Sequence, residues 1–123
     1  MVEFVAPCHA PIIRSSAAPY CLHQCLDATP FLDSMVGTGA GDIAFHELVD
    51  LGKAKLDYGK SVILAGNLGG SQNIMCEGLP QDVEAAARDA IGMAKEGCIF
   101  WLSGGCEIHQ AFWSEHHRFR AGI

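Results

Sequence analysis

The sequence predicts an α/β fold, because short apolar runs alternate with stretches in which apolar residues recur at helical spacing. Four runs rich in β-branched and aromatic residues are typical of buried strands: 20–24, 42–45, 61–65 and 98–102. Helical spacing is found between them at 30–36, 46–58 and 82–95. This alternation favours four parallel βα units joined by right-handed crossovers.

The helix predicted at 82–95 has the clearest boundaries. Pro80 and Asp82 stand at its start, small and apolar residues recur along it at helical steps, and Gly97 closes it. At the other end of the chain, three prolines within residues 1–19 allow at most a short and broken helix. Three glycine-rich segments fall at strand ends and are predicted to be turns: 37–41, 66–70 and 104–105.

Four βα units make half of a (β/α)8 TIM barrel, a fold that takes about 250 residues when complete. The 123 residues are therefore expected to form a single partial domain over 1–123. A half barrel has two open parallel edges, and such edges tend to pair with another chain or with missing sequence. The chain also stops at Ile123, before a full helix could follow the last strand. We expect a fragment, a split-gene product, or a half that needs a partner half barrel or a homo-oligomer.

Composition excludes several classes of partner. The formal charge is −6, with 8 Lys and Arg against 14 Asp and Glu, so no basic stripe is available for nucleic acid. No apolar run approaches the roughly 20 residues of a membrane span, and the N-terminus lacks the features of a signal peptide. A cytoplasmic protein is expected.

In that reducing compartment the 6 cysteines are core thiols or metal ligands rather than disulfides.

His23, Cys25 and Cys106 are the candidate metal ligands. His23 and Cys25 are two apart at the end of the first predicted strand, so both side chains point to the same side. Cys106 follows the fourth strand after a Gly-Gly turn and emerges at the same carboxyl edge of a parallel sheet. One imidazole and two thiolates suit Zn²⁺ and leave a position open for a substrate. Core packing of the cysteines is the alternative, because cysteine is among the most buried residue types.

Glu47 has two interpretations. It follows the second strand and could serve as an exchangeable fourth ligand, or it is a first-turn glutamate favoured by the helix dipole, which we prefer. Asn67, with Gly66, is predicted to form a tight turn and could line the entrance to the active site.

Other polar residues and thiols have less telling positions. Three aspartates could contact substrate or support the ligands, or else be caps and solubilising charges: Asp27, Asp42 and Asp50, the last placed inside a helix. Three histidines are predicted to be exposed loop residues: His109, His116 and His117. Four cysteines are predicted to be structural thiols, most of them in the core: Cys8, Cys21, Cys76 and Cys98.

The order of these motifs resembles the corrinoid-linked methyltransferase branch of the uroporphyrinogen decarboxylase-like superfamily. The match to its proline, strand and His-x-Cys pattern is PYCLHQC, and the distal cysteine lies in IFWLSGGCEI. Intervening segments that are similar to this branch are TGAGDIAFHELVDL, VILAGN and GLPQDVEAAARDAI. Together they cover residues 19–110.

The resemblance implies the C-terminal half of a (β/α)8 barrel with zinc on His23, Cys25 and Cys106. It further implies transfer of a methyl group from the methylcobamide of a corrinoid protein to a thiol such as coenzyme M, through attack by a zinc-bound thiolate. The chain departs from the family pattern after Cys25, where Leu26 and Asp27 replace Gly-Asn, and around 114–116. The alternatives are a uroporphyrinogen decarboxylase-type enzyme and a non-catalytic zinc-binding half barrel that acts as a subunit.

Overall fold

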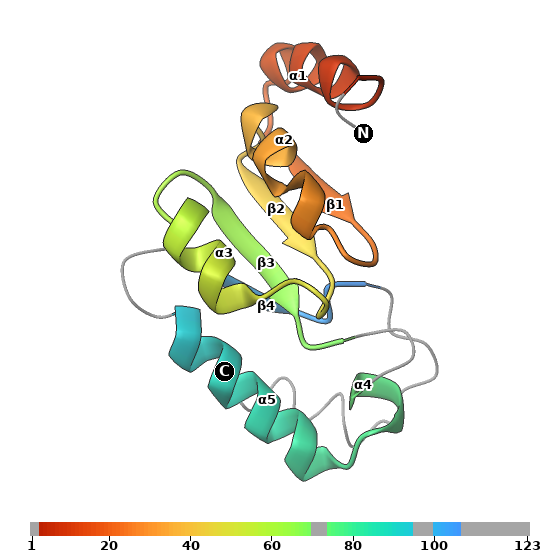
Figure 1. Ribbon diagram of the computed structural model, residues 1–123, viewed down its shortest axis with the longest axis vertical. Helices are drawn as coiled ribbons and strands as arrows, with labels where there is room; N and C mark the ends of the chain where they lie inside the picture. The colour runs from red at the N-terminus through yellow and green to blue at the C-terminus, as the bar shows by residue number, and fades with distance from the viewer. Residues whose placement is uncertain (1–2, 70–73, 95–99, 107–123) are drawn as a thin grey trace.

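A computed structural model describes residues 3–69, 74–94 and 100–106 of the chain (Figure 1). Its centre is a four-stranded sheet in which every pairing is parallel and the strands follow one another in chain order. The strands are β1 (Cys21–Gln24), β2 (Asp42–Phe45), β3 (Ile63–Asn67) and β4 (Phe100–Ser103). The prediction of an α/β fold with four parallel strands is therefore confirmed.

Helical segments alternate with these strands. They are α1 (Ala6–Ser15), η1 (Thr29–Phe31), α2 (Leu32–Gly37), α3 (Leu51–Tyr58), α4 (Ile74–Glu77) and α5 (Pro80–Ala94). Helix α3 packs on α5, and α5 packs on β4. Within the described residues, none of the helices combines the length and the apolar character that a bilayer span requires.

The two faces of the sheet have different environments. Leu22, Ile43 and Leu64 lie side by side in the parallel register and are buried in the core. The next row, one residue along each strand, points to the opposite face. This row consists of His23, Ala44, Ala65 and Trp101. The side chains at its two ends, His23 and Trp101, are exposed. The helices therefore cover one face, and the opposite face is open at β1 and β4.

The predicted helix at 82–95 is observed as α5, which begins at Pro80. Its buried face repeats at three- and four-residue steps, which is the spacing of one side of a helix: Val83, Ala87, Ala90 and Ala94. At its start, the Asp82 carboxylate accepts a hydrogen bond of 3.1 Å from the Leu79 backbone N–H. Residues 95–97, including the predicted closing Gly97, lie outside the described residues.

The helix predicted over 46–58 begins only at Leu51. The preceding residues form a turn in which the Val49 N–H donates to the His46 carbonyl over 3.1 Å. Asp50 is then the N-cap of α3, and its carboxylate accepts a bond of 2.9 Å from the Lys53 N–H. Asp50 is therefore a cap at the helix boundary, and its predicted place inside a helix was wrong.

The third strand lies two residues later than predicted. The N–H groups of Ser61 and Val62 donate to the Tyr58 carbonyl, so these residues form the turn that follows α3. Gly66 and Asn67 are consequently the last residues of β3 and not a turn after it.

Smaller differences concern the other elements. The first strand begins one residue later than predicted, and the helix expected at 30–36 is divided into η1 and α2. Helix α1 continues through Pro11 at the cost of one backbone hydrogen bond, so it is longer and less broken than predicted. The fourth strand is described from Phe100, because residues 98 and 99 lie outside the described range.

Candidate metal centre

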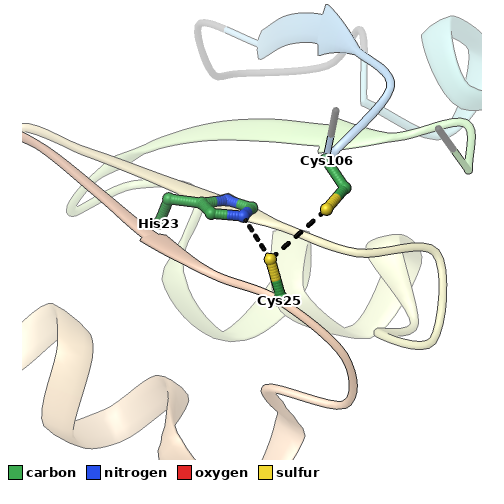
Figure 2. Close-up of side chains that lie close together, drawn as sticks. All are labelled: His23, Cys25 and Cys106. Atoms are coloured by element: carbon green, nitrogen blue, oxygen red, sulfur yellow. Dashed lines mark hydrogen bonds between the residues drawn. The ribbon is translucent and has the colours of Figure 1, made fainter. Parts of the chain in front are cut away.

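His23, Cys25 and Cys106 come together at the carboxyl edge of the sheet (Figure 2). The His23 Nε2 atom lies 3.0 Å from the Cys25 sulfur, which in turn lies 3.3 Å from the Cys106 sulfur. All three potential ligand atoms are within 4.8 Å of one another, although the two cysteines are 81 residues apart in sequence. The parallel order of the strands produces this meeting, since β1 and β4 both end at this edge.

Gly105 is the residue that allows Cys106 to reach the other two. Its φ angle of +72° lies in the left-handed region, which L-residues with a side chain rarely adopt. A Cβ atom at this position would stand 2.4 Å from the carbonyl oxygen of Phe45. The backbone after β4 therefore lies directly against the end of β2, and this close approach directs Cys106 toward β1.

A pocket of about 270 Å³ adjoins the cluster. Its lining consists of His23, Ala44, Ser103, Gly105 and Cys106. Ala44 contributes only a methyl group, which leaves the space beside the imidazole open. Cys106 lines the pocket and is half-buried, and Cys25 beside it is exposed, so a small molecule can approach both sulfur atoms.

The donor set fits a zinc ion. Two sulfurs bound tetrahedrally at about 2.3 Å would be about 3.8 Å apart, and a nitrogen and a sulfur slightly less. The observed separations of 3.3 and 3.0 Å are shorter by roughly half an ångström, which side-chain rotation can supply. Three such ligands leave one coordination position for a substrate.

Glu47 is not a member of this cluster. It lies in the turn between β2 and α3, and its carboxylate oxygen is 2.7 Å from Nδ1 of His46. The preferred interpretation as a first-turn glutamate was wrong, because the helix begins four residues later, at Leu51. Sequence reasoning also passed over His46, although its position immediately after β2 was a sign that it belongs to the sheet's carboxyl edge.

Asn67 faces away from the cluster and toward α5. Its side-chain amide donates a bond of 2.8 Å to the Val49 carbonyl, which holds the turn after β2 against the end of β3. It lines a second hollow, of about 410 Å³, together with Glu47 and Asp89. Asn67 and Glu47 are thus neighbours of each other, and neither lines the pocket beside His23.

Asp27 is exposed and begins the turn that leads into η1. Its carboxylate accepts a bond of 2.9 Å from the Thr29 N–H. Hydrogen bonds from the Thr29 side chain and then from its backbone lower the pKa of Asp27. This bond closes a local turn just before η1, two residues after Cys25 in the chain.

Asp42 and Cys21 are neighbours at the opposite, amino end of the strands. Asp42 is 8% exposed, and within the described part of the chain its Oδ1 atom has no hydrogen-bond partner. Partial burial of its sulfur raises the pKa of the Cys21 thiol to about 11, and the hydrogen bond with Asp42 adds to the effect. This pKa favours the protonated thiol at neutral pH, and Cys21 does not belong to the cluster of His23, Cys25 and Cys106.

The prediction that most of the remaining cysteines lie in the core was wrong for those that can be placed. Cys21 is exposed because strand alternation directs it to the uncovered face, and Cys8 is exposed because α1 buries none of its residues. Cys76, in α4, is half-buried. Five other residues considered in the sequence lie outside the described residues: Cys98, His109, Ser114, His116 and His117.

The fold and the cluster define a class: half of a parallel βα barrel with a His-Cys-Cys group at the carboxyl ends of its strands. The family model of uroporphyrinogen decarboxylase (URO-D) matches residues 2–119. The chain therefore belongs to the uroporphyrinogen decarboxylase family. No curated protein matches the sequence.

A solved structure described as a methyltransferase from Methanosarcina mazei has a similar fold. The TM-score is 0.83 at 21% sequence identity. The match covers 98% of this chain and 35% of that chain, so this chain spans about a third of the length of its structural relative. At this identity the likeness establishes the fold, which is that of part of a TIM barrel.

Proposed function

We propose that this chain is the metal-binding half of a zinc-dependent methyltransferase that moves a methyl group from a methylated corrinoid protein to a thiol such as coenzyme M. The observation that carries the proposal is the meeting of His23, Cys25 and Cys106 within 4.8 Å. Membership of the uroporphyrinogen decarboxylase family and the fold shared with a protein named as a methyltransferase support it.

In this proposal His23, Cys25 and Cys106 hold Zn²⁺, and the pocket beside them receives the acceptor thiol. Zinc, when bound, supplies Lewis acidity that lowers the pKa of a thiol and so makes its sulfur a nucleophile at neutral pH. Two cysteine thiolates offset the charge of the dication, which keeps an added thiolate electron-rich. The small side chain of Ala44 leaves room for the acceptor, and the open side of the pocket lets a corrinoid protein present its methylcobamide.

Three further residues have proposed roles around this centre. Asp27 is exposed two residues after Cys25 and is a candidate contact for the substrate. Asn67 would support the site from the neighbouring hollow, because it holds the turn that contains Glu47. Glu47 could become the fourth ligand only by leaving His46, so that role requires a movement of the turn.

Metal content tests the first step. The freshly purified protein should contain about one zinc per chain, and Cys25→Ala and Cys106→Ala should each lose it, because two ligands seldom retain the ion. Cys8→Ala is the matched control, since Cys8 is an exposed thiol on α1, outside the cluster, and this variant should keep its zinc. Wild-type protein without metal would contradict the proposal.

Methyl transfer is tested separately. Methylcob(III)alamin and a thiol should show a faster change in the cobalamin absorption spectrum with the zinc-loaded protein than with the thiol alone. The assay should be repeated with a candidate N-terminal half barrel, because the chain spans only 35% of its structural relative. Absence of acceleration in both arrangements would refute the catalytic claim.

Two alternatives have support of their own. A uroporphyrinogen decarboxylase-type activity is favoured by the description of the matching family, and it predicts turnover that does not depend on zinc. A non-catalytic zinc-binding subunit is favoured by the open face of the sheet, and it predicts zinc binding without methyl transfer. The metal and absorption experiments distinguish all three.

A further inference from the structure

We infer that Cys25 and Cys106 form a modification site, at which a peroxide oxidises the two thiols to a disulfide. The two sulfurs are already 3.3 Å apart and point toward each other (Figure 2). The disulfide itself follows from this geometry alone. Its consequence for metal binding rests on the proposed function.

The approach needed for bond formation is small. A disulfide has a sulfur–sulfur distance of about 2.05 Å, so the observed pair must close by about 1.2 Å. Both cysteines lie just beyond the strands, Cys25 after the end of β1 and Cys106 after the Gly104–Gly105 turn that follows β4. Their movement therefore does not require any hydrogen bond of the sheet to break.

Differences in exposure indicate the order of the two chemical steps. Cys25 is the exposed member of the pair, so its sulfur meets a peroxide from solvent first. Its sulfur attacks one peroxide oxygen, the O–O bond breaks, and the products are a sulfenic acid and one water. Half-buried Cys106 then attacks the sulfenic sulfur, forming the S–S bond and releasing a second water.

The overall reaction balances. Two thiols and one hydrogen peroxide give one disulfide and two waters, with the sulfurs losing two electrons and the peroxide gaining them. Both thiolate ligands are consumed, which leaves His23 as the one remaining member of the cluster. A single imidazole does not retain zinc, so oxidation should release the metal, and a dithiol reductant should restore the site.

The first experiment uses the full chain, stripped of metal with a chelator and treated with hydrogen peroxide. Intact mass should fall by two hydrogens, and peptide mapping should join Cys25 to Cys106. Cys25→Ser and Cys106→Ser should lose this link, whereas Cys8→Ser, which removes an exposed thiol outside the cluster, should keep it. Folded wild-type protein that gains oxygen at either cysteine without forming the link would overturn the inference.

The second experiment separates the inference from the proposed function. Zinc-loaded protein receives peroxide in the presence of a chromogenic chelator, and one zinc should appear for each disulfide formed and return after dithiothreitol treatment. Protein that forms the link but never binds zinc would sustain the modification site and refute the proposed function. Protein that binds zinc and keeps both thiols under peroxide would refute the modification site and sustain zinc binding in the proposed function.

Discussion

Gly105 follows β4 and lies directly against the end of β2, a strand that is distant in the sequence. Its positive φ angle and its contact with the end of β2 leave no space for a side chain. The position of the Cys106 sulfur, and with it the distance of 3.3 Å to Cys25, depends on this one backbone conformation.

Gly105→Ala is therefore expected to damage both stability and metal binding. The positive φ costs about 1–2 kcal/mol for a residue with a Cβ. The methyl group must also displace the Phe45 carbonyl, because it would stand 2.4 Å away. Urea denaturation and zinc titration measure the two effects.

Gly92→Ala is the matched control for that substitution. Gly92 lies inside α5, and an added Cβ would meet nothing within 4 Å. This variant should gain about 1 kcal/mol, since alanine favours a helix over glycine. Wild-type zinc affinity in Gly105→Ala would show that the glycine does not position Cys106.

The sequence sufficed to predict that His23, Cys25 and Cys106 meet, but not how the residues around them are arranged. The period of two in a strand places His23 and Cys25 on one side, and parallel pairing brings Cys106 to the same edge. The side-chain directions of Glu47 and Asn67 could not be predicted from strand period and parallel pairing. Their directions depend on contacts of the turn after β2, namely the His46–Glu47 pair and the bond from Asn67 to Val49.

The boundaries of the helices also depend on individual hydrogen bonds that the sequence pattern does not reveal. Periodicity predicted α5 well because its buried face persists over about three turns, from Val83 to Ala94. The start of α3 was misplaced by five residues because apolar residues at 48 and 49 continue the helical spacing through a turn. The Asp50 cap decides the boundary, and its role is visible only when its bond to the Lys53 N–H is known.

Asp50→Ala should destabilise the protein through α3. The substitution removes the carboxylate that satisfies the Lys53 N–H at the first turn of the helix. Loss of such a cap costs about 1 kcal/mol. Thermal or urea denaturation measures the change, and Asp50→Asn should recover most of the loss, because its amide oxygen also accepts the bond. Equal stability of the alanine variant and the wild type would contradict the assigned cap.

A hydrogen bond between Tyr58 and Asp33 joins α3 to α2. The Tyr58 hydroxyl donates to the Asp33 carboxylate over 2.6 Å. This bond, followed by burial and the negative charges of Asp33 and Asp57, raises the pKa of Tyr58 to about 12. Tyrosine in an unfolded chain has a pKa of about 10.

The sign of the pH effect follows from that increase. Because the folded pKa is raised, the stabilisation is complete below about pH 10 and disappears as the pH rises toward about 12. Tyr58→Phe should lose about 0.5–1 kcal/mol at neutral pH, a modest value because solvent screens this surface contact. The difference between wild type and variant should shrink across that alkaline interval, as urea denaturation at several pH values would reveal. A difference that stays constant with pH would exclude the bond as its cause.

The whole molecule presents a sheet with one covered and one open face. At the open face Trp101 is 59% exposed, and both β1 and β4 are edge strands of the described sheet. Exposed parallel edges and large apolar side chains favour association. This chain spans 35% of its structural relative, and a complete TIM barrel has eight strands.

We therefore expect the isolated chain to associate with itself in the absence of a partner half barrel. Pairing of β4 from one copy with β1 of another would continue the parallel sheet and cover Trp101. Sedimentation velocity should detect a dimer or a larger species, and Trp101→Ser should shift it toward the monomer, because the indole no longer gains from burial. Leu56→Ser is the control, since Leu56 is 83% exposed on α3, the helix that connects the two central strands β2 and β3. A wild-type chain that stays monomeric at high concentration would mean that the open edges are protected without a second half.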